Sequence, residues 1–515
     1  MRNRLAAIGA AGVVLATLAG CGSTVSSTGI ASGAVSGDGL GATVAGPSDI
    51  ASATGKGAAT ATTTTASGST ASDSLPNTTS DNTEASSPTG GATTPGTYSP
   101  VLKPVKIGFV VYDTAGFTAV TGSSDQGNTS SANQQADRDE MTALVAYANA
   151  TGGVNGRKIL PPIGYRLSTT DALNDQTLAA VCAKATEDDK VEAFIDRSFM
   201  ITDNLVTCFA RHHVNLASFL VATGDKVLRS VSPYVASTQP TVERSAKALI
   251  DGLATTDYFK GAKVGVVYDD SVSSTAAYNQ IIVPQLKSHG VTVAEHFSVS
   301  STDTGAQTNQ GAAAVLRFRA AGITHVVWFA PFLAQLSFTN GAESQNYYPR
   351  YGWSDYAGGV GDAGFYVSAN ENKNSVAVSV LNAYVVEKSE VNKTRSVTSA
   401  VDRKTASPGA RRCLDTLSKY LKTDYYRANA GRSTDYAFLC DDFFLWLEGA
   451  RHAEQPFKAA LWGAGVHALG RSYLAVLANT TDFTQRLSGA DTVRIGIYAN
   501  GKCKCFAAVG PWKHF

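Results

Sequence analysis

The stretch YANATGGVNGRKI, Tyr147–Ile159, concentrates two adjacent glycines, an Asn-Gly pair and an arginine in one short span. Apolar side chains at i, i+3, i+4 and i+7 from Met141 to Ala148 predict an amphipathic helix that runs into this span. The glycine pair accepts the left-handed backbone that ends a helix, and the Asn-Gly pair suits a tight turn. The stretch therefore predicts a sharp return of the chain from a helix towards a sheet.

Two similar apolar runs frame this turn at a distance. VKIGFVVYD, Val105–Asp113, is nearly continuous in apolar and β-branched residues, as expected for a strand that is buried on both faces of a parallel sheet. KVGVVYDD, Lys263–Asp270, repeats that character after several alternations of helix and strand patterns. We therefore expect an α/β fold with two doubly wound parallel-sheet lobes, and a ligand cleft at the carboxyl ends of their strands.

The first hundred residues have a different character. Residues 1–20 combine Arg2 and Arg4 with a short apolar run, which is typical of an export signal. The sequence Leu-Ala-Gly before Cys21 resembles a bacterial lipobox, so we expect Cys21 to carry lipid and anchor the chain to the cell membrane; an ordinary secretory signal is the alternative. Residues 21–100 are dominated by Ser, Thr, Gly and Ala and predict a disordered tether.

The charge of the chain excludes one class of partner. Forty-three Lys and Arg against 42 Asp and Glu give a net charge of +1, so no basic surface for nucleic acid is expected. No later apolar stretch is long enough to cross a bilayer. We expect an extracytoplasmic, lipid-anchored body.

Four segments in order resemble one family. NATGGVNGRKI, KVGVVYDD, GITHVVWFAP and STDYAFLCDDFFLWLEGARHA are similar to segments of type I periplasmic solute-binding proteins, in the branched-chain amino-acid-binding group that serves ABC transporters. The resemblance implies a monomer that binds a small-molecule ligand, such as an amino acid or amide, and passes it to an ABC permease. It also implies neither catalysis nor a cofactor. A ligand-sensing receptor on the same scaffold is the alternative, and an envelope hydrolase would need a nucleophile motif that the sequence lacks.

The same resemblance implies three passages of the chain between the lobes. The first lobe would comprise residues 101–237 and 364–480, and the second lobe residues 238–363 and 481–515. Closure of such a hinge around a solute is a transition between two rigid-body states.

Loops that follow strands supply the expected ligand contacts. Arg197 adds a charge where the family has a Gly-rich Ser/Thr loop, which leaves acidic or aromatic solutes open; a surface ion pair with Asp196 or Asp203 is the alternative. Asp355 could hold a ligand amine or cap a turn, and Phe117 could cover the ligand or simply be packed. The full set of expected contacts is Phe117, Arg197, Ser198, Phe199, Ala222 and Thr223 in the first lobe, and Asp270, Ser271, Ser273, Phe332 and Asp355 in the second.

Six cysteines follow Cys21, and in an exported chain they favour disulfide bonds over metal binding. The resemblance implies a bond between Cys182 and Cys208, and we expect another between Cys413 and Cys440, which lie on two late helices. The pairing of the remaining two stays open, because a bond between residues at i and i+2 would be strained and zinc binding by Cys503, Cys505 and His514 lacks a fourth ligand. No metal site is expected.

One motif match is set aside. Gly359–Gly364 fits GxGxxG, but it precedes the strand-like FYVSA, so no phosphate-binding loop is expected there.

Overall fold

The described residues all belong to one compact unit. The signal and the tether expected at 1–20 and 21–100 lie outside the described residues. The computed structural model describes residues 102–113, 130–168, 174–197, 202–219, 223–393, 400–428, 430 and 436–515.

The first lobe is built on a five-stranded parallel sheet in the order β2-β1-β3-β4-β5. All seven residues of the first strand are buried, as its apolar run predicts. The strands are β1 (Ile107–Asp113), β2 (Ile163–Ser168), β3 (Ala193–Asp196), β4 (Asn215–Ser218) and β5 (Val235–Ser237).

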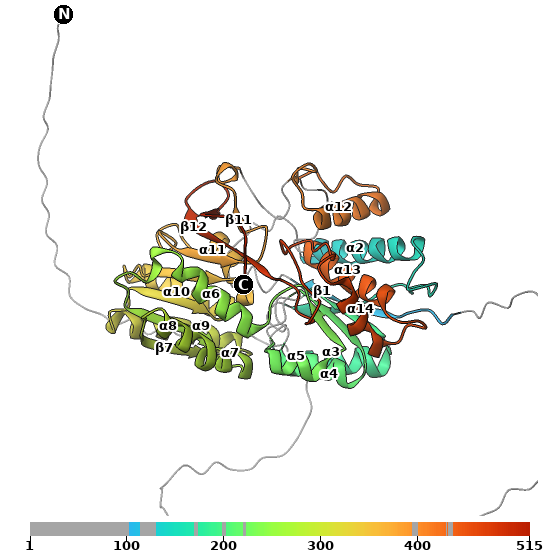
Figure 1. Ribbon diagram of the computed structural model, residues 1–515, viewed down its shortest axis with the longest axis horizontal. Coiled ribbons are helices and arrows are strands. Elements are labelled where there is room, and N and C mark those ends of the chain that lie inside the picture. The colour runs from blue at the N-terminus through green and yellow to red at the C-terminus, as the bar shows by residue number, and fades with distance from the viewer. Residues whose placement is uncertain are drawn as a thin grey trace, which may run out of the picture. The chain divides into compact units, whose positions relative to one another are not determined.

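Helices cover both faces of this sheet (Figure 1). Phe109 of β1 belongs to the apolar cluster that includes α2, whereas Val110 belongs to the cluster that includes α3 and α4. In Figure 1 the helix α2 lies above β1, and α3, α4 and α5 lie below it. These helices are α2 (Ser130–Ala150), α3 (Asp175–Ala183), α4 (Asp203–Arg211) and α5 (Asp225–Val231).

The turn after α2 holds three parts of the first lobe together. Gly153 has φ +64°, and a Cβ atom there would lie 2.1 Å from the Arg157 carbonyl oxygen. Arg157 donates from Nη2 to both carboxylate oxygens of Glu192, just before β3, at 2.7 Å. Arg451 of α13 (Tyr436–His452) donates to the Gly153 carbonyl at 2.9 Å. Gly153 is therefore needed for the tight turn, and Arg157 for the contact of this turn with the residue before β3.

The second lobe contains a mixed sheet in the order β11-β13-β12-β10-β9-β8-β6-β7, with β14 paired to β12. Its strands β6 to β10 run parallel, whereas β12 is antiparallel to β10 and β13, a feature that the expected purely parallel sheet lacks. The strands are β6 (Val264–Asp269), β7 (Val293–Val299), β8 (His325–Phe329), β9 (Arg350–Ser354), β10 (Val376–Ser379), β11 (Val385–Val386), β12 (Thr492–Ala499), β13 (Cys505–Ala508) and β14 (Lys513–His514).

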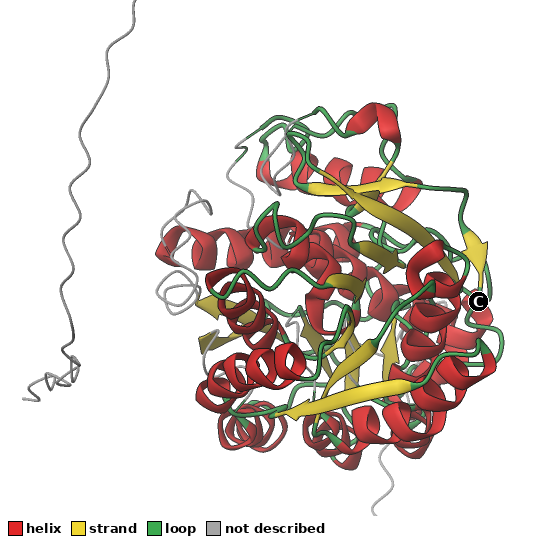
Figure 2. Cartoon of the chain, turned by 90° about the vertical axis from the view of Figure 1, so that its left-hand side faces the viewer, coloured by secondary structure: helices red, strands yellow, loops and turns green. Residues whose placement is uncertain are grey.

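Helices again flank both faces of this sheet (Figure 2). One apolar cluster includes α6, α7 and α8, and another includes α9, α10 and α11. These helices are α6 (Val242–Ala254), α7 (Val272–Ala277), α8 (Val283–Ser288), α9 (Thr304–Ala320), α10 (Phe332–Ser344) and α11 (Gly359–Tyr366). Among the described residues, no helix combines the length and the apolar character needed to cross a bilayer.

The GxGxxG match lies within α11 and not in a loop before a strand. A Cβ atom at Gly361 would lie 2.7 Å from the Tyr384 ring, and one at Gly364 would lie 2.4 Å from the Lys504 carbonyl oxygen. The glycines let α11 pack closely on its neighbours in the second lobe. The prediction of a strand at FYVSA is therefore wrong, because the first two of these residues belong to α11.

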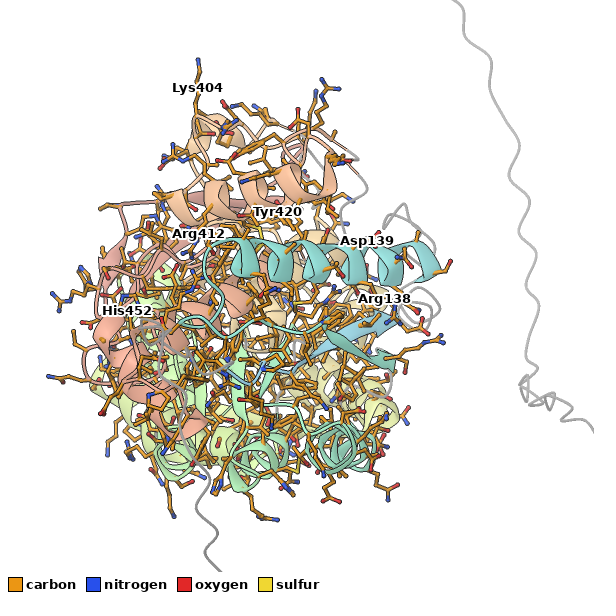
Figure 3. The ribbon with its side chains drawn as sticks, turned by 90° about the vertical axis from the view of Figure 1, so that its right-hand side faces the viewer. Arg138, Asp139, Lys404, Arg412, Tyr420 and His452 are labelled. Carbon is orange, nitrogen blue, oxygen red and sulfur yellow. A yellow bond between two sulfur atoms is a disulfide. The ribbon has the colours of Figure 1, made fainter. Side chains whose placement is uncertain are left out.

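The chain returns to the first lobe later than the boundary expected at Ala363–Gly364. The strand β10 pairs with β9, and β11 pairs with β13, so both belong to the second sheet. The next helices along the chain, α12 (Pro408–Leu421) and α13, both pack on α2 of the first lobe (Figure 3). The boundary at Gly364 is wrong because a short apolar strand carries no signal that tells which of two sheets it joins.

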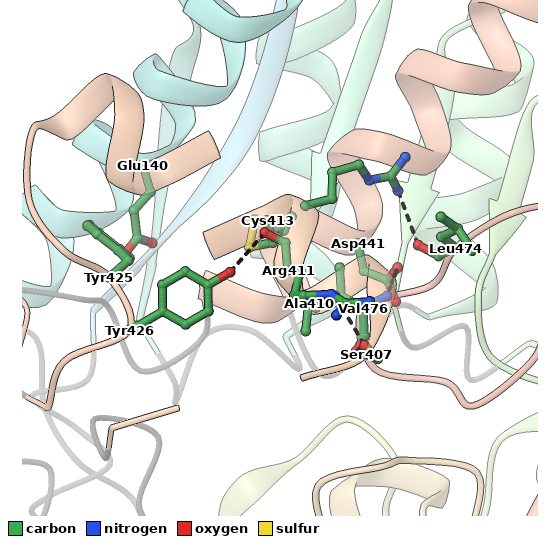
Figure 4. The surroundings of a disulfide bond; sticks show 12 residues. Glu140, Ser407, Ala410, Arg411, Cys413, Tyr425, Tyr426, Asp441, Leu474 and Val476 are labelled. Carbon is green, nitrogen blue, oxygen red and sulfur yellow. Dashed lines mark hydrogen bonds between the residues drawn. A yellow bond between two sulfur atoms is a disulfide. The ribbon is translucent and has the colours of Figure 1, made fainter. Parts of the chain in front are cut away.

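Disulfide bonds support both lobes. Cys182 of α3 is bonded to Cys208 of α4, as expected. Cys413 of α12 is bonded to Cys440 of α13, also as expected, and Figure 4 shows the surroundings of this bond at Cys413. Cys503 and Cys505 are bonded to each other, which removes the alternative that they bind zinc. Among the described residues, no group of three or more His, Cys, Asp and Glu side chains is placed to hold a metal ion.

Candidate ligand-binding site

The hinge between the lobes is formed where crossover segments lie side by side. The first crossover, 238–241, leads from β5 to α6, and the third crossover, 470–491, leads from α14 (Trp462–Leu469) to β12. The Ser237 amide donates to the Leu487 carbonyl at 2.8 Å, and the Ala490 amide donates to the Thr238 carbonyl at 2.9 Å. Backbone hydrogen bonds thus tie the first crossover to the third.

Two side chains add to this hinge. The Thr238 hydroxyl donates to Asp441 of α13 at 3.0 Å, so the first crossover is also bound to the first lobe. Arg244 of α6 donates to the carbonyl oxygens of Ser488 at 3.0 Å and Ala490 at 2.5 Å, so the third crossover is bound to the second lobe. The hinge therefore has a fixed anchor in each lobe.

A small cavity of about 20 Å³ lies beside the hinge at the carboxyl ends of β9 and β10. Such a volume accommodates about one water molecule. Side chains from the first crossover, α6, the ends of these strands and the start of β12 line it: Gln239, Pro240, Ser245, Ala248, Ser354, Asp355, Tyr356, Val378, Val380 and Val493.

Asp355 places a carboxylate in the lining of this cavity. Its Oδ2 accepts hydrogen bonds from the Ser379 hydroxyl at 2.7 Å and from the Val380 amide at 2.6 Å. Its Oδ1 is buried and has no hydrogen-bond partner in the protein. Burial raises the pKa of Asp355 to about 7, although the Ser379 hydroxyl and the Val380 amide act in the opposite direction. One oxygen of Asp355 is thus held by hydrogen bonds, and the other can still accept a hydrogen bond.

Asp269, at the end of β6, lies next to this cavity. It accepts hydrogen bonds from the Tyr356 hydroxyl at 2.7 Å and from the Ser271 amide at 3.0 Å. Ser271 caps α7 by accepting a hydrogen bond from the Ser274 amide at 3.1 Å. Burial raises the pKa of Asp269, whereas the hydroxyls and the amide around it lower that pKa. The start of α7 is therefore rigidly placed.

Ser273 of α7 joins the second lobe to two helix starts of the first lobe. Its hydroxyl donates to Asp203 Oδ2 of α4 at 3.0 Å and accepts from the Gly224 amide, before α5, at 2.9 Å. Burial raises the pKa of Asp203, while the hydroxyls of Ser273 and Thr223 act in the opposite direction. A residue expected to touch ligand thus bridges the lobes.

Arg197 follows β3 and is fully buried. Its guanidinium forms an ion pair with Asp137 of α2 and lies 5.6 Å from the centre of the Tyr112 ring. Asp137 also accepts a hydrogen bond from the Tyr112 amide at 3.2 Å. The predicted surface ion pair is therefore wrong, because Arg197 is buried and pairs with the buried Asp137, 60 residues earlier in the chain.

Residues 104–370, more than half of the chain, match the sequence model of the family described as periplasmic binding protein. The chain belongs to this family. No curated protein matches the sequence of this periplasmic binding protein.

Solved structures share the fold at low sequence identity. A substrate-binding periplasmic protein from Ralstonia solanacearum is 15% identical, with a TM-score of 0.54 over 77% of this chain and 98% of that chain. A branched-chain amino acid ABC transporter protein from Thermus thermophilus with bound valine is 14% identical, with a TM-score of 0.54 over 80% and 98%. A solute-binding protein from R. palustris in complex with 4-hydroxybenzoate is 13% identical, with a TM-score of 0.51 over 80% and 96%.

Other residues expected at the site of this periplasmic binding protein are distributed as follows. Thr223 is buried at the end of the loop before α5. Asp270 is exposed and accepts a hydrogen bond from the Ser301 amide at 2.8 Å. Phe332 is buried in the second lobe, 5.2 Å from the Tyr366 ring between centroids. Four expected contacts lie outside the described residues, namely Phe117, Ser198, Phe199 and Ala222.

The expected site residues do not include Asp203, Gly224 or Gln239. Asp203 follows Thr202, a residue type that caps helix starts, and Gly224 directly follows the expected contact Thr223, so local patterns indicate both. Gln239 follows a β-strand in a segment with no motif. Its place at the hinge depends on tertiary structure alone.

Proposed function

We propose that this periplasmic binding protein is an extracytoplasmic, lipid-anchored protein that captures a small polar solute between its lobes for import by an ABC permease. The observation that carries the proposal is the hinge, whose crossovers are bound to both lobes next to the carboxyl ends of β9 and β10. In α/β folds ligands bind at those strand ends. Capture requires only that the solute favours the closed arrangement, with no bond chemistry.

Polar groups in loops that follow strands of both lobes favour a solute with hydrogen-bonding groups, such as an amino acid or an amide. In the first lobe, Thr223 lies in the loop between β4 and α5. In the second lobe, Asp270 and Ser271 follow β6, and Asp355 lies at the hinge. Phe117, Ser198, Phe199 and Ala222 remain predicted contacts. Arg197 is assigned a supporting role because Asp137 neutralises its charge inside the first lobe.

The membrane connection rests on the sequence. Cys21 after Leu-Ala-Gly would receive the lipid, and the segment up to residue 100 would act as the tether. Metabolic labelling with a fatty-acid analogue tests this part: the wild-type chain should be labelled, and Cys21→Ser should be unlabelled and released from membranes. Labelling of the Cys21→Ser variant would contradict the anchor.

Mass spectrometry of small molecules that stay bound through purification tests the capture function. We expect one small polar compound, retained in about one copy per chain, that is released on unfolding. Copurification of a permease and its ATPase from membranes would support import. A chain that retains nothing and shows no thermal stabilisation by a broad panel of metabolites would contradict solute capture.

A further inference from the structure

Two buried polar atoms at the hinge cavity lack partners in the protein. Nε2 of Gln239 and Oδ1 of Asp355 are both buried without a hydrogen bond, and both residues line the cavity. Gln239 is 1% exposed, and its backbone amide donates a hydrogen bond to the Ser237 hydroxyl at 2.9 Å. An unpaired buried polar group costs about 1–3 kcal/mol, so two of them in one cavity indicate a bound species.

The size and the chemistry of the cavity select that species. Its volume of about 20 Å³ is too small for an amino acid and suits one water molecule. An amide N–H donor on one side disfavours a metal ion or an ammonium group, which need acceptors. Water can accept from the amide and donate to the carboxylate at once.

We propose that the hinge cavity binds a single water molecule, which accepts a hydrogen bond from Gln239 Nε2, donates one to Asp355 Oδ1 and so fixes the first crossover to the second lobe. The proposal rests on the proposed function only in that this crossover belongs to a closing hinge. Gln239 acts here as a positioning residue, because it binds the water and not the solute.

The surroundings of Asp355 support this assignment. Asp355 is surrounded by the Ser379 hydroxyl at the end of β10 and the Val380 and Leu381 amides just after it, and Gln239 and Ser245 line the same cavity. The neighbouring Tyr356 hydroxyl is taken by Asp269. The pKa of Asp355 is raised to about 7 because its carboxylate is buried. A water donor at Oδ1 would therefore offset part of the cost of burying the carboxylate.

Oxygen-17 magnetic relaxation dispersion, which counts long-lived internal waters in solution, tests the proposal on the full chain. Gln239→Met keeps the length of the side chain and removes the donor, so we expect one long-lived water fewer than in the wild type. Ser245→Ala is the matched control, because Ser245 lines the same cavity and is not one of the unpaired groups. It should leave the count unchanged. Equal counts in all three proteins would overturn the proposal.

A high-resolution crystal structure of the wild type provides a second measurement if Gln239→Met does not fold. We expect one spherical density peak within hydrogen-bond distance of both Gln239 and Asp355. A dry cavity, a metal ion or a group of the bound solute in that place would overturn the water site. Each of these results would leave solute capture intact, whereas failure to retain or respond to any solute would overturn the proposed function and leave the water count unaffected.

Discussion

The hydroxyl of Ser273 donates a hydrogen bond to Asp203 Oδ2 at 3.0 Å and thereby joins α7 of the second lobe to the start of α4 in the first lobe. Its oxygen also accepts from the Gly224 amide at 2.9 Å. One side chain thus binds one oxygen of a partly buried carboxylate and a helix-start amide across the two lobes. The arrangement shown by the structure is therefore stabilised by contacts between the lobes.

Ser273→Ala should weaken this arrangement, because a hydrogen bond to a charged group contributes about 1.5–3 kcal/mol. Spin labels at Lys287→Cys in α8 and Lys419→Cys in α12 would report the distance between the lobes. We expect Ser273→Ala to broaden or shift the distance distribution. Thr275→Ala, on the same helix, is the control, and an equal response of the two variants would refute the role of Ser273.

Gly224→Ala tests the same contact from the other side. The added Cβ atom would lie 2.7 Å from Glu243 Oε1 and 2.9 Å from Ser273 Oγ, so these two side chains of the second lobe must move away and the contact between the lobes is loosened. We expect a longer distance between the same two labels and weaker retention of the solute. Gly510→Ala serves as the control, because nothing lies within 4 Å of the added atom and the backbone there is not in the left-handed region. An unchanged distance in Gly224→Ala would show that the contact does not limit closure.

The buried ion pair of Arg197 and Asp137 should be essential for the stability of the first lobe. Arg197→Met leaves the Asp137 carboxylate buried without its cation, and removal of one partner of a buried pair costs about 3–5 kcal/mol. Urea unfolding should show this loss. The double variant Arg197→Met/Asp137→Asn removes both charges and keeps an acceptor for the Tyr112 amide, so it should recover much of the stability. No recovery would mean that the charge is not the reason.

Glu371 should make stability depend on pH. Burial raises the pKa of Glu371 from 4.5 to about 7, and its Oε2 accepts a hydrogen bond from the Tyr351 hydroxyl at 2.5 Å. The folded state therefore binds a proton more tightly than the unfolded state, so this contribution is greatest below pH 4.5 and is lost as the pH rises to about 7. Glu371→Gln should flatten the unfolding free energy between pH 5 and about 7. Parallel curves for the two proteins would contradict this assignment.

Two of the disulfide bonds should differ in their contributions to the free energy of unfolding. Cys413 and Cys440 close a loop of 27 residues, whereas Cys503 and Cys505 are two residues apart. Because a longer loop restricts the unfolded chain more, Cys413→Ser/Cys440→Ser should lower the unfolding free energy by about 2–4 kcal/mol and Cys503→Ser/Cys505→Ser by less. Equal losses, measured by urea unfolding, would show that loop closure does not decide the ranking.

The fold could be predicted from the sequence because its signals are local. The apolar run of β1 and the glycines after α2 determine a buried strand and a sharp turn whatever lies around them. The disulfide between Cys413 and Cys440 could also be anticipated, since both lie on expected helices.

The details of the site depend on residues that are distant in the sequence. Arg197 lies 60 residues from its partner Asp137, and Ser273 lies 70 residues from Asp203. No periodicity or motif connects such pairs. The expected boundary at Gly364 is wrong for the same reason. The residues of β10 do not indicate that this strand pairs with β9 and β12 of the second sheet.

The distance between labels on α8 and α12, measured by pulsed electron paramagnetic resonance with and without solute, tests solute-driven closure most directly. The protein would be stripped of retained molecules by reversible unfolding and then returned to the extract of those molecules. We predict that the mean distance changes and its distribution narrows when the extract is added. Identical distributions in the two conditions, with the extract bound in a parallel binding assay, would contradict closure around a solute.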